Sequence, residues 1–162
     1  LSPRSRRLFT LSAIFVATRA LLADIAEDDL SDQVATGADY WEGISEGFTE
    51  WHHVREGKLS AGEVRRDFIH SHGTVLHSLG NAGRAALADG EPNWKDIGVR
   101  LADLDWRRAN TAVWEGRAMT AGRVSKSMNN VTLTANVIKN HLGLSLSADE
   151  QRVEDAFRRG DS

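Results

Sequence analysis

The stretch DWRRANTAVWEGRAMTAGRVSKSMNNVTLTANVIKNHLG, residues 105–143, contains the two kinds of pattern that decide the fold. Its first part, residues 106–127, has no regular hydrophobic period. In its second part, apolar residues recur at steps of three and four, which predicts a helix over residues 130–142. These apolar residues are Val131, Ala135, Ile138 and Leu142. Gly143 follows directly, in the position where a helix commonly ends.

The charge of this stretch differs from that of the whole chain. The 162-residue chain has a formal net charge of −3, whereas residues 106–148 contain one acidic side chain, Glu115, against six basic ones. The basic side chains are Arg107, Arg108, Arg117, Arg123, Lys126 and Lys139. Positive charge concentrated within an acidic chain is a candidate polyanion-binding surface, and nucleic acid is the commonest polyanion. We call residues 105–126 the basic segment.

Outward from this stretch, helical spacing recurs along most of the chain, and no long run alternates with period two. We therefore predict an all-α fold, a compact multi-helix domain of about six to seven helices spanning residues 1–162. The predicted helices cover residues up to 25, then 31–56, 61–69, 75–87, 94–104, 130–142 and 148–159.

Several predicted helices have recognisable starts. The sequences from Ser60 to Glu63 and from Ser147 to Glu150 match the capping box, in which a Ser and a Glu three residues later each satisfy a backbone N–H of the first turn. The first helix has three candidate starts, which are Ser2-Pro3, Ser5 and Thr10.

Composition limits the class of protein. Hydrophobic residues make up 41% and charged residues 27%, which is typical of a globular chain. The absence of Cys excludes a disulfide framework and a thiolate zinc site, and it agrees with a reducing cytoplasm. The most apolar run, residues 8–22, is too short and too polar to span a bilayer. We expect a cytoplasmic protein without a membrane segment, cut from a longer chain because it begins at Leu1 without Met.

The basic segment precedes the helix predicted at 130–142, and a helix N-terminus favours anions. Phosphate contacts are therefore predicted from Arg107, Arg108, Arg117, Arg123 and Lys126. Alternatively, these side chains are solvated or pair with residues 24–63, which contain eleven acidic and two basic side chains.

Further DNA contacts are predicted on both sides of the basic segment. Asn pairs well with adenine, so Asn129, Asn130 and Asn136 are candidate base contacts. Arg4, Arg6 and Arg7 are candidate secondary backbone contacts, although their segment could instead be a loop to a missing domain. Trp at helical spacing more often belongs to a core than to a base-stacking surface. Among the five Trp, Trp106 and Trp114 lie within the basic segment, so these two are the candidates for base stacking.

Other chemistry is weakly supported. His70, His72 and His77 invite a metal interpretation, but their spacing does not bring them together on a helix, so capping or buried polar roles are favoured. Residues 116–123 lack the spacing of a phosphate loop. We predict no metal, no cofactor and no catalytic residue, and a hydrolase or nuclease using His70 or His72 is the least supported alternative.

Four stretches resemble the DndB family, the DNA sulfur modification proteins of bacterial phosphorothioation gene clusters. They are LSPRSRRLFTLSAI (1–14), IHSHG (69–73), LDWRRAN (104–110) and WEGRAMTAGRVSKSMNNVTLTANVIKNHLGL (114–144). The resemblance implies a regulator that binds DNA upstream of the modification genes and represses them, distinct from the desulfurase and iron–sulfur components. The family's N-terminal D-G-Q-H-R motif is absent here, so the chain would be a C-terminal part.

These two lines of reasoning give one leading hypothesis, a helical C-terminal domain of a DNA-binding repressor. Its expected partners are double-stranded DNA and the missing N-terminal domain of the same chain. The alternative is a helical interaction or dimerisation module, with a second copy of the chain as a partner, that supports a DNA-reading N-terminal half.

Overall fold

The computed structural model describes residues 1–2 and 4–161. Within these residues the chain forms α1 (Leu11–Leu21), α2 (Leu30–Ser45), α3 (Thr49–Arg55), α4 (Ala61–Asp67), α5 (Gly73–Ala88), α6 (Trp94–Leu101), α7 (Thr111–Trp114), β1 (Met119–Thr120), β2 (Arg123–Val124), α8 (Met128–Leu142) and α9 (Ala148–Arg159). The helical class is confirmed in its main feature, with more helices than predicted and one two-stranded antiparallel hairpin.

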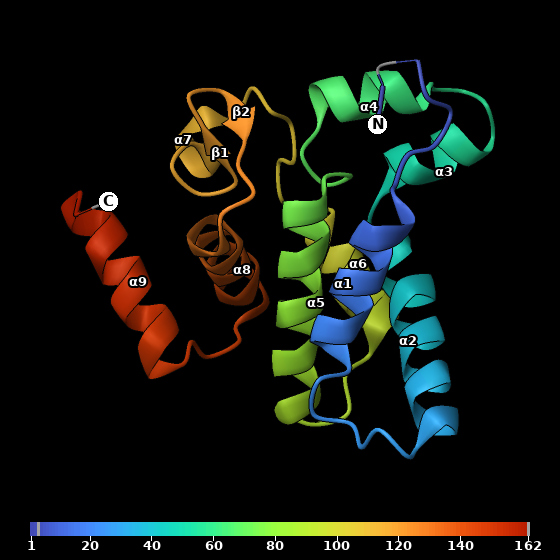
Figure 1. Ribbon diagram of the computed structural model, residues 1–162, viewed down its shortest axis with the longest axis vertical. Helices are drawn as coiled ribbons and strands as arrows, with labels where there is room; N and C mark the ends of the chain where they lie inside the picture. The colour runs from blue at the N-terminus through green and yellow to red at the C-terminus, as the bar shows by residue number, and fades with distance from the viewer. Residues whose placement is uncertain (3, 162) are drawn as a thin grey trace.

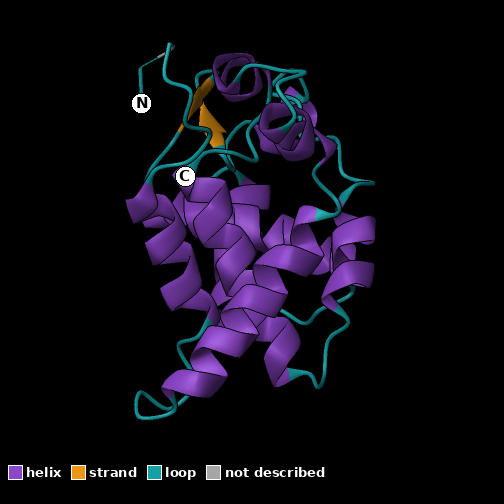
Figure 2. Cartoon of the chain, turned by 90° about the vertical axis from the view of Figure 1, so that its right-hand side faces the viewer, coloured by secondary structure: helices purple, strands orange, loops and turns teal. Residues whose placement is uncertain are grey.

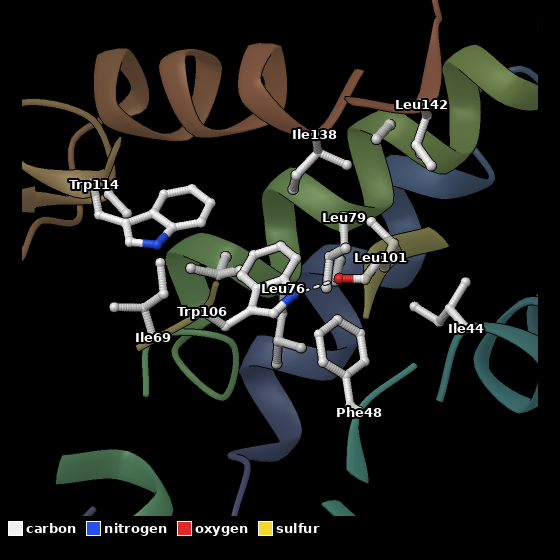
Figure 3. Packing of buried hydrophobic residues seen from close by; sticks show 14 of the residues in the cluster. Ile44, Phe48, Ile69, Leu76, Leu79, Leu101, Trp106, Trp114, Ile138 and Leu142 are labelled. Carbon is white, nitrogen blue, oxygen red and sulfur yellow. Dashed lines mark hydrogen bonds between the residues drawn. The ribbon is translucent and has the colours of Figure 1, made fainter. Parts of the chain in front are cut away.

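Helix α5 is the centre of the arrangement (Figure 1). It packs against α1 and against α8, while α2 packs against α6 and α9 packs against α8. A continuous hydrophobic cluster joins α1, α2, α5, α6 and α8. Figure 3 shows its centre, where the Trp106 indole N–H donates to the Leu101 carbonyl at 2.8 Å among the packed apolar side chains. Tyr40 of α2 adds a buried polar link by donating to the Leu79 carbonyl at 2.6 Å.

The single helix predicted over residues 31–56 is wrong, because α2 ends at Ser45 and α3 begins at Thr49. Between them, Phe48 leaves the helical region (φ −114°, ψ 78°) and places its ring in the core. Gly47 lies so close to α6 that a Cβ atom there would be 1.9 Å from the Gly98 carbonyl oxygen. The break therefore follows from the close approach of α2 and α6, which the local sequence does not encode.

Other helix starts agree with the sequence. Thr10 caps α1 through the Ala13 N–H, so the latest of the three candidate starts is observed, while Pro3 lies outside the described residues. Both capping boxes are present, at Ser60 and at Ser147. Helix α4 ends two residues before the predicted position because Phe68 is extended and bridges to Arg107.

Residues 106–127 are irregular, as predicted, and contain α7 and the hairpin. The hairpin turn uses Ala121 (φ 49°) and Gly122 (φ 71°), both in the left-handed region. The Glu115 carboxylate accepts hydrogen bonds from the N–H groups of both, at 2.5 and 3.1 Å. The one acidic residue of the basic segment from Trp106 onward therefore holds the turn that connects β1 to β2.

Candidate nucleic-acid interface

Arg117 of the basic segment points into the protein. Its guanidinium forms a two-point ion pair with Glu154 of α9, at 2.8 and 2.7 Å, and lies 4.3 Å from the centre of the Phe157 ring. The side chain is 14% exposed and that of Glu154 is 1% exposed. The guanidinium holds the pKa of Glu154 below its usual value. Arg117 thus attaches α9 to the rest of the fold, and this enclosure leaves it little surface for a phosphate.

Arg108 is also engaged internally. Its Nη2 donates to the Arg65 carbonyl at 3.1 Å, and its Nε is buried without a hydrogen-bond partner among the described residues. Trp106 and Trp114 stack on each other within the core, 5.2 Å apart, so their rings belong to the interior. These side chains stabilise the irregular segment instead of lying on its surface.

The three predicted base contacts of α8 divide into two buried asparagines and one exposed asparagine. Asn136 is fully buried and donates to the Glu150 carbonyl at 3.0 Å. Asn130 is buried at the start of the helix, where its Oδ1 accepts from the hydroxyls of Ser125 and Ser127. Asn129 is exposed. Of the three predicted base contacts, Asn129 is the one whose side chain reaches the surface.

The remaining cations of the basic segment are exposed. Arg107 makes a two-point contact with Asp105, at 2.8 and 2.5 Å, which lowers the pKa of Asp105 to about 2. Arg123 and Lys126 form no ion pair with any residue that the structure describes. None of the ion pairs within residues 1–2 and 4–161 joins the acidic residues 24–63 to the basic segment. The pairing alternative therefore finds no support there.

A groove of about 960 Å³ lies beside Lys126. Its walls come from α1, α4, the first turns of α5, and the connection from β2 to α8, including Lys126. Leu1 and Leu8 of the N-terminal segment also line it. Arg65 of α4 holds that segment in place, because its guanidinium donates to the carbonyls of Ser2, Ser5 and Arg7.

The groove brings two predicted contact regions together. Arg4, Arg6 and Arg7 are exposed on the N-terminal segment. Arg123 and Lys126 are exposed more than a hundred residues later in the chain, on β2 and on the connection to α8. Figures 1 and 2 both place the N-terminal segment and the hairpin at the same end of the molecule. We call the five exposed cations of these two segments the basic rim. It consists of Arg4, Arg6, Arg7, Arg123 and Lys126.

The three histidines occupy different environments. His70 is fully buried; its Nδ1 accepts from the Trp51 indole at 3.0 Å, so its Nε2 carries the proton and donates to Glu50 at 3.2 Å. His72 and His77 line the groove. Burial lowers the pKa of all three. No group of three metal-ligating side chains occurs among residues 1–2 and 4–161.

Sequence reasoning missed three groove residues, Ser71, Arg65 and Arg66. It also missed the partners of Arg117 and Lys139, which are Glu154 and Glu150 of α9. The signal for these partners was available, because Glu150 and Glu154 are four residues apart and share one face of the last helix.

Comparison with known proteins gives the family. Residues 1–145 match the model of the DndB family, described as DNA-sulfur modification-associated. The chain therefore belongs to the DndB family and is associated with DNA sulfur modification. The match covers α1 to α8, including the groove, and ends before α9. Comparisons with curated proteins and with solved structures found no match. Among the described helices, none has the length and apolar character needed to cross a membrane.

Proposed function

We propose that this chain supplies a DNA-backbone-binding surface to a repressor of the DNA sulfur modification genes. The observation that carries the proposal is the basic rim, whose five exposed cations lie on two distant segments that both contribute residues to one groove, with Lys126 itself in the groove lining. Lys and Arg side chains that neutralise phosphates bind DNA largely without regard to sequence. Arg107 and Asn129 are exposed as well and extend the candidate contacts, with Asn129 as the candidate for base reading.

The enclosed residues are left out of this surface. Arg117 would have to give up Glu154, and Asn136 has no exposed atoms to offer a base. Arg108 and Asn130 are held by internal hydrogen bonds. The proposal therefore rests on the rim, and the enclosed side chains serve to hold the rim's supporting elements in place.

Affinity for duplex DNA tests the proposal. The variant Arg6→Ala/Arg123→Ala removes one cation from each side of the rim without changing a side chain that lines the groove. The matched control, Arg19→Ala/Arg152→Ala, removes two exposed arginines from α1 and α9. We expect the rim variant to bind a duplex at least tenfold more weakly, and the control to bind like the wild type. If both variants bind the duplex equally weakly, the loss of affinity follows from net charge alone, which would contradict a localised DNA-binding surface.

Repression is tested separately in a bacterial reporter strain. A reporter gene is placed behind the region upstream of the modification genes, and the protein is expressed in the same strain. Wild-type protein should lower reporter output, and Arg6→Ala/Arg123→Ala should release it at equal protein level. Full repression by the rim variant would separate gene regulation from this surface.

An apolar face on α1 favours the second candidate function, an interaction module that pairs with another copy of the chain. Leu11, Ile14 and Phe15 recur at helical spacing and are 83%, 36% and 58% exposed. Residues 1–23 contain four Arg and no acid, whereas residues 24–63 are strongly acidic, so two copies could pair with opposite charges facing each other. Light scattering should then show a dimer that Phe15→Ser converts to monomer. A wild-type chain that stays monomeric at high concentration would exclude this candidate.

A further inference from the structure

The first turn of α5 lacks the partners that helix starts normally have. His72 occupies the N-cap position without a capping hydrogen bond, whereas the other described helices of eight or more residues all have a side-chain cap. Within α5 the first N–H that has an acceptor is that of Leu76, which donates to the His72 carbonyl at 3.0 Å. The N–H groups of Gly73, Thr74 and Val75 therefore have no acceptor among the described residues.

This helix start is enclosed by the protein. Thr74 is 6% exposed and Val75 is fully buried, although Gly73 is open to the groove. Buried N–H groups nearly always have a partner, so the donors of the two buried residues, Thr74 and Val75, require an explanation. A helix N-terminus also carries a partial positive charge that favours an anion.

An independent observation comes from Ser71. Ser71 is one of the residues that line the groove, it is 5% exposed, and its buried Oγ has no hydrogen-bond partner among the described residues. A nearly buried hydroxyl without a partner is an unused donor and acceptor. It lies two residues before Gly73, so the hydroxyl and the free N–H groups belong to the same short segment of groove wall.

The charge and size of the groove indicate the ligand class. Lys126, Arg65 and Arg66 line it against one acidic side chain, Glu63, which is already held by the Ser60 N–H and hydroxyl. Several N–H donors, a hydroxyl and a cation are the recognition groups of phosphate sites. The volume of about 960 Å³ exceeds the needs of a phosphate alone, and the apolar walls from Leu8, Val16 and Met128 suit an attached sugar and base.

We propose that the groove binds a phosphate ester of nucleotide size, with its phosphoryl oxygens on the N–H groups of Gly73 and Thr74, the Ser71 hydroxyl and the Lys126 ammonium group. The ester is either a free nucleotide or a nucleotide unit of a DNA strand, since the phosphoryl chemistry is the same in both. This site goes beyond the basic rim, which needs only exposed cations, and it uses groups that the rim does not.

Backbone amide NMR of the 162-residue chain tests the site with three probes: inorganic phosphate, deoxyguanosine 5′-monophosphate and a short DNA duplex. Deoxyguanosine, which lacks the phosphate, is the control. We expect saturable shifts of the Gly73 and Thr74 N–H signals with the monophosphate and none with the nucleoside. Shifts with the monophosphate assign the site to free nucleotides, and shifts with the duplex alone assign it to DNA. If no probe moves these signals at millimolar concentration, the proposal is overturned.

Two matched substitutions at Gly73 separate binding from folding. Gly73→Pro removes the N–H, and Pro is well suited to the first position of a helix when an extended residue such as His72 (ψ 146°) precedes it. Gly73→Ala keeps the N–H and adds a methyl group 3.4 Å from the Ala13 Cβ, an ordinary contact. We expect Gly73→Pro and Ser71→Ala each to bind about tenfold more weakly than Gly73→Ala. Equal affinities in all three would overturn the proposal.

The rim variant distinguishes the two proposals. Arg6→Ala/Arg123→Ala leaves the groove lining unchanged, so it should bind the monophosphate like the wild type even where duplex binding is lost. If Gly73→Pro loses monophosphate binding but keeps duplex binding, the groove and the rim are separate binding sites.

Discussion

At the residue scale, the Arg117–Glu154 pair shows how a side chain that looks like a DNA contact can be structural. Both carboxylate oxygens are engaged, Glu154 is 1% exposed, and Asn136 makes a further contact to it at 3.4 Å. Arg158 also contacts Glu154, at 3.2 Å, but its side chain is 63% exposed. Removal of Arg117 therefore leaves the buried Glu154 charge without its enclosed partner, which is far more damaging than loss of an exposed pair.

We predict that Arg117→Ala lowers the free energy of unfolding by about 3–5 kcal/mol. The double variant Arg117→Met/Glu154→Leu should recover most of that loss, because it leaves no buried charge. Urea denaturation of the wild type and both variants measures the effect. As a control, Arg152→Ala breaks an exposed pair and should change stability little. An Arg117→Ala protein as stable as the control would contradict this structural role.

Three histidines, the buried His70 and the half-buried His72 and His77, predict the pH dependence of stability. Burial lowers the pKa of His70, His72 and His77. As the pH falls below about 6.5, the unfolded chain therefore binds protons before the folded chain does. Their contribution is complete above that pH and is lost on acidification, by up to about 1.4 kcal/mol per pH unit for each group.

Unfolding free energies at pH 7.5 and pH 5.5 measure this effect. Stability should be lower at pH 5.5, and His77→Gln should reduce the difference, because it removes one of the three titrating groups. A stability that stays level or rises between pH 7.5 and pH 5.5 would show that the histidines are protonated in the folded protein.

The identity of individual contact residues could be predicted only in part. Composition identifies the basic segment, and in the structure Arg123 and Lys126 are exposed. The sequence does not show which cations turn inward, because Arg117 finds its partner 37 residues later, in α9. The role proposed for Ser71 could not be predicted, because it depends on an enclosed helix start and not on a motif.

At the element scale, glycines set how closely the helices approach. Gly80 of α5 faces α1, where a Cβ atom would lie 2.2 Å from the Ala17 carbonyl oxygen. Gly37 of α2 also faces α1, but there a Cβ atom would be 3.6 Å from the Thr18 Cγ2, which is ordinary contact. The same substitution at these two positions should therefore have opposite effects.

We predict that Gly80→Ala destabilises the protein by about 1–3 kcal/mol, because α1 and α5 must move apart. Gly37→Ala should stabilise it by about 0.5–1 kcal/mol, because Ala restricts the unfolded chain and favours the helix. Thermal and urea unfolding of the pair provide the comparison. If both substitutions stabilise, the α1–α5 contact is looser than described.

Helix starts were the elements best predicted from sequence, because a cap depends on residues three positions apart. Ser60, Ser147 and the helix at 148–159 were predicted with the observed bounds or nearly so. The break between α2 and α3 was not, because periodicity continues through it and only the approach of Gly98 forces the chain to bend. The small hairpin was missed because two-residue strands leave no period to detect.

At the scale of the whole molecule, the fold joins segments that the sequence keeps apart. The N-terminal segment and the β2–α8 connection are more than a hundred residues apart, and they meet beside α5 around one groove. Each was a candidate contact from its charge, but their convergence depends on the packing of α1 and α8 against α5. The basic rim is therefore a property of the tertiary structure.

The salt dependence of duplex binding tests the rim most directly. Binding that releases counterions weakens linearly on a plot of log affinity against log salt, with a slope of about −0.9 for each phosphate contact. We predict that the wild type has a steep slope and that Arg6→Ala/Arg123→Ala is shallower by about 2, because two contacts are lost. The control Arg19→Ala/Arg152→Ala should keep the wild-type slope. Identical slopes for the wild type and the rim variant, or no duplex binding at low salt, would contradict a DNA-binding role for this end of the molecule.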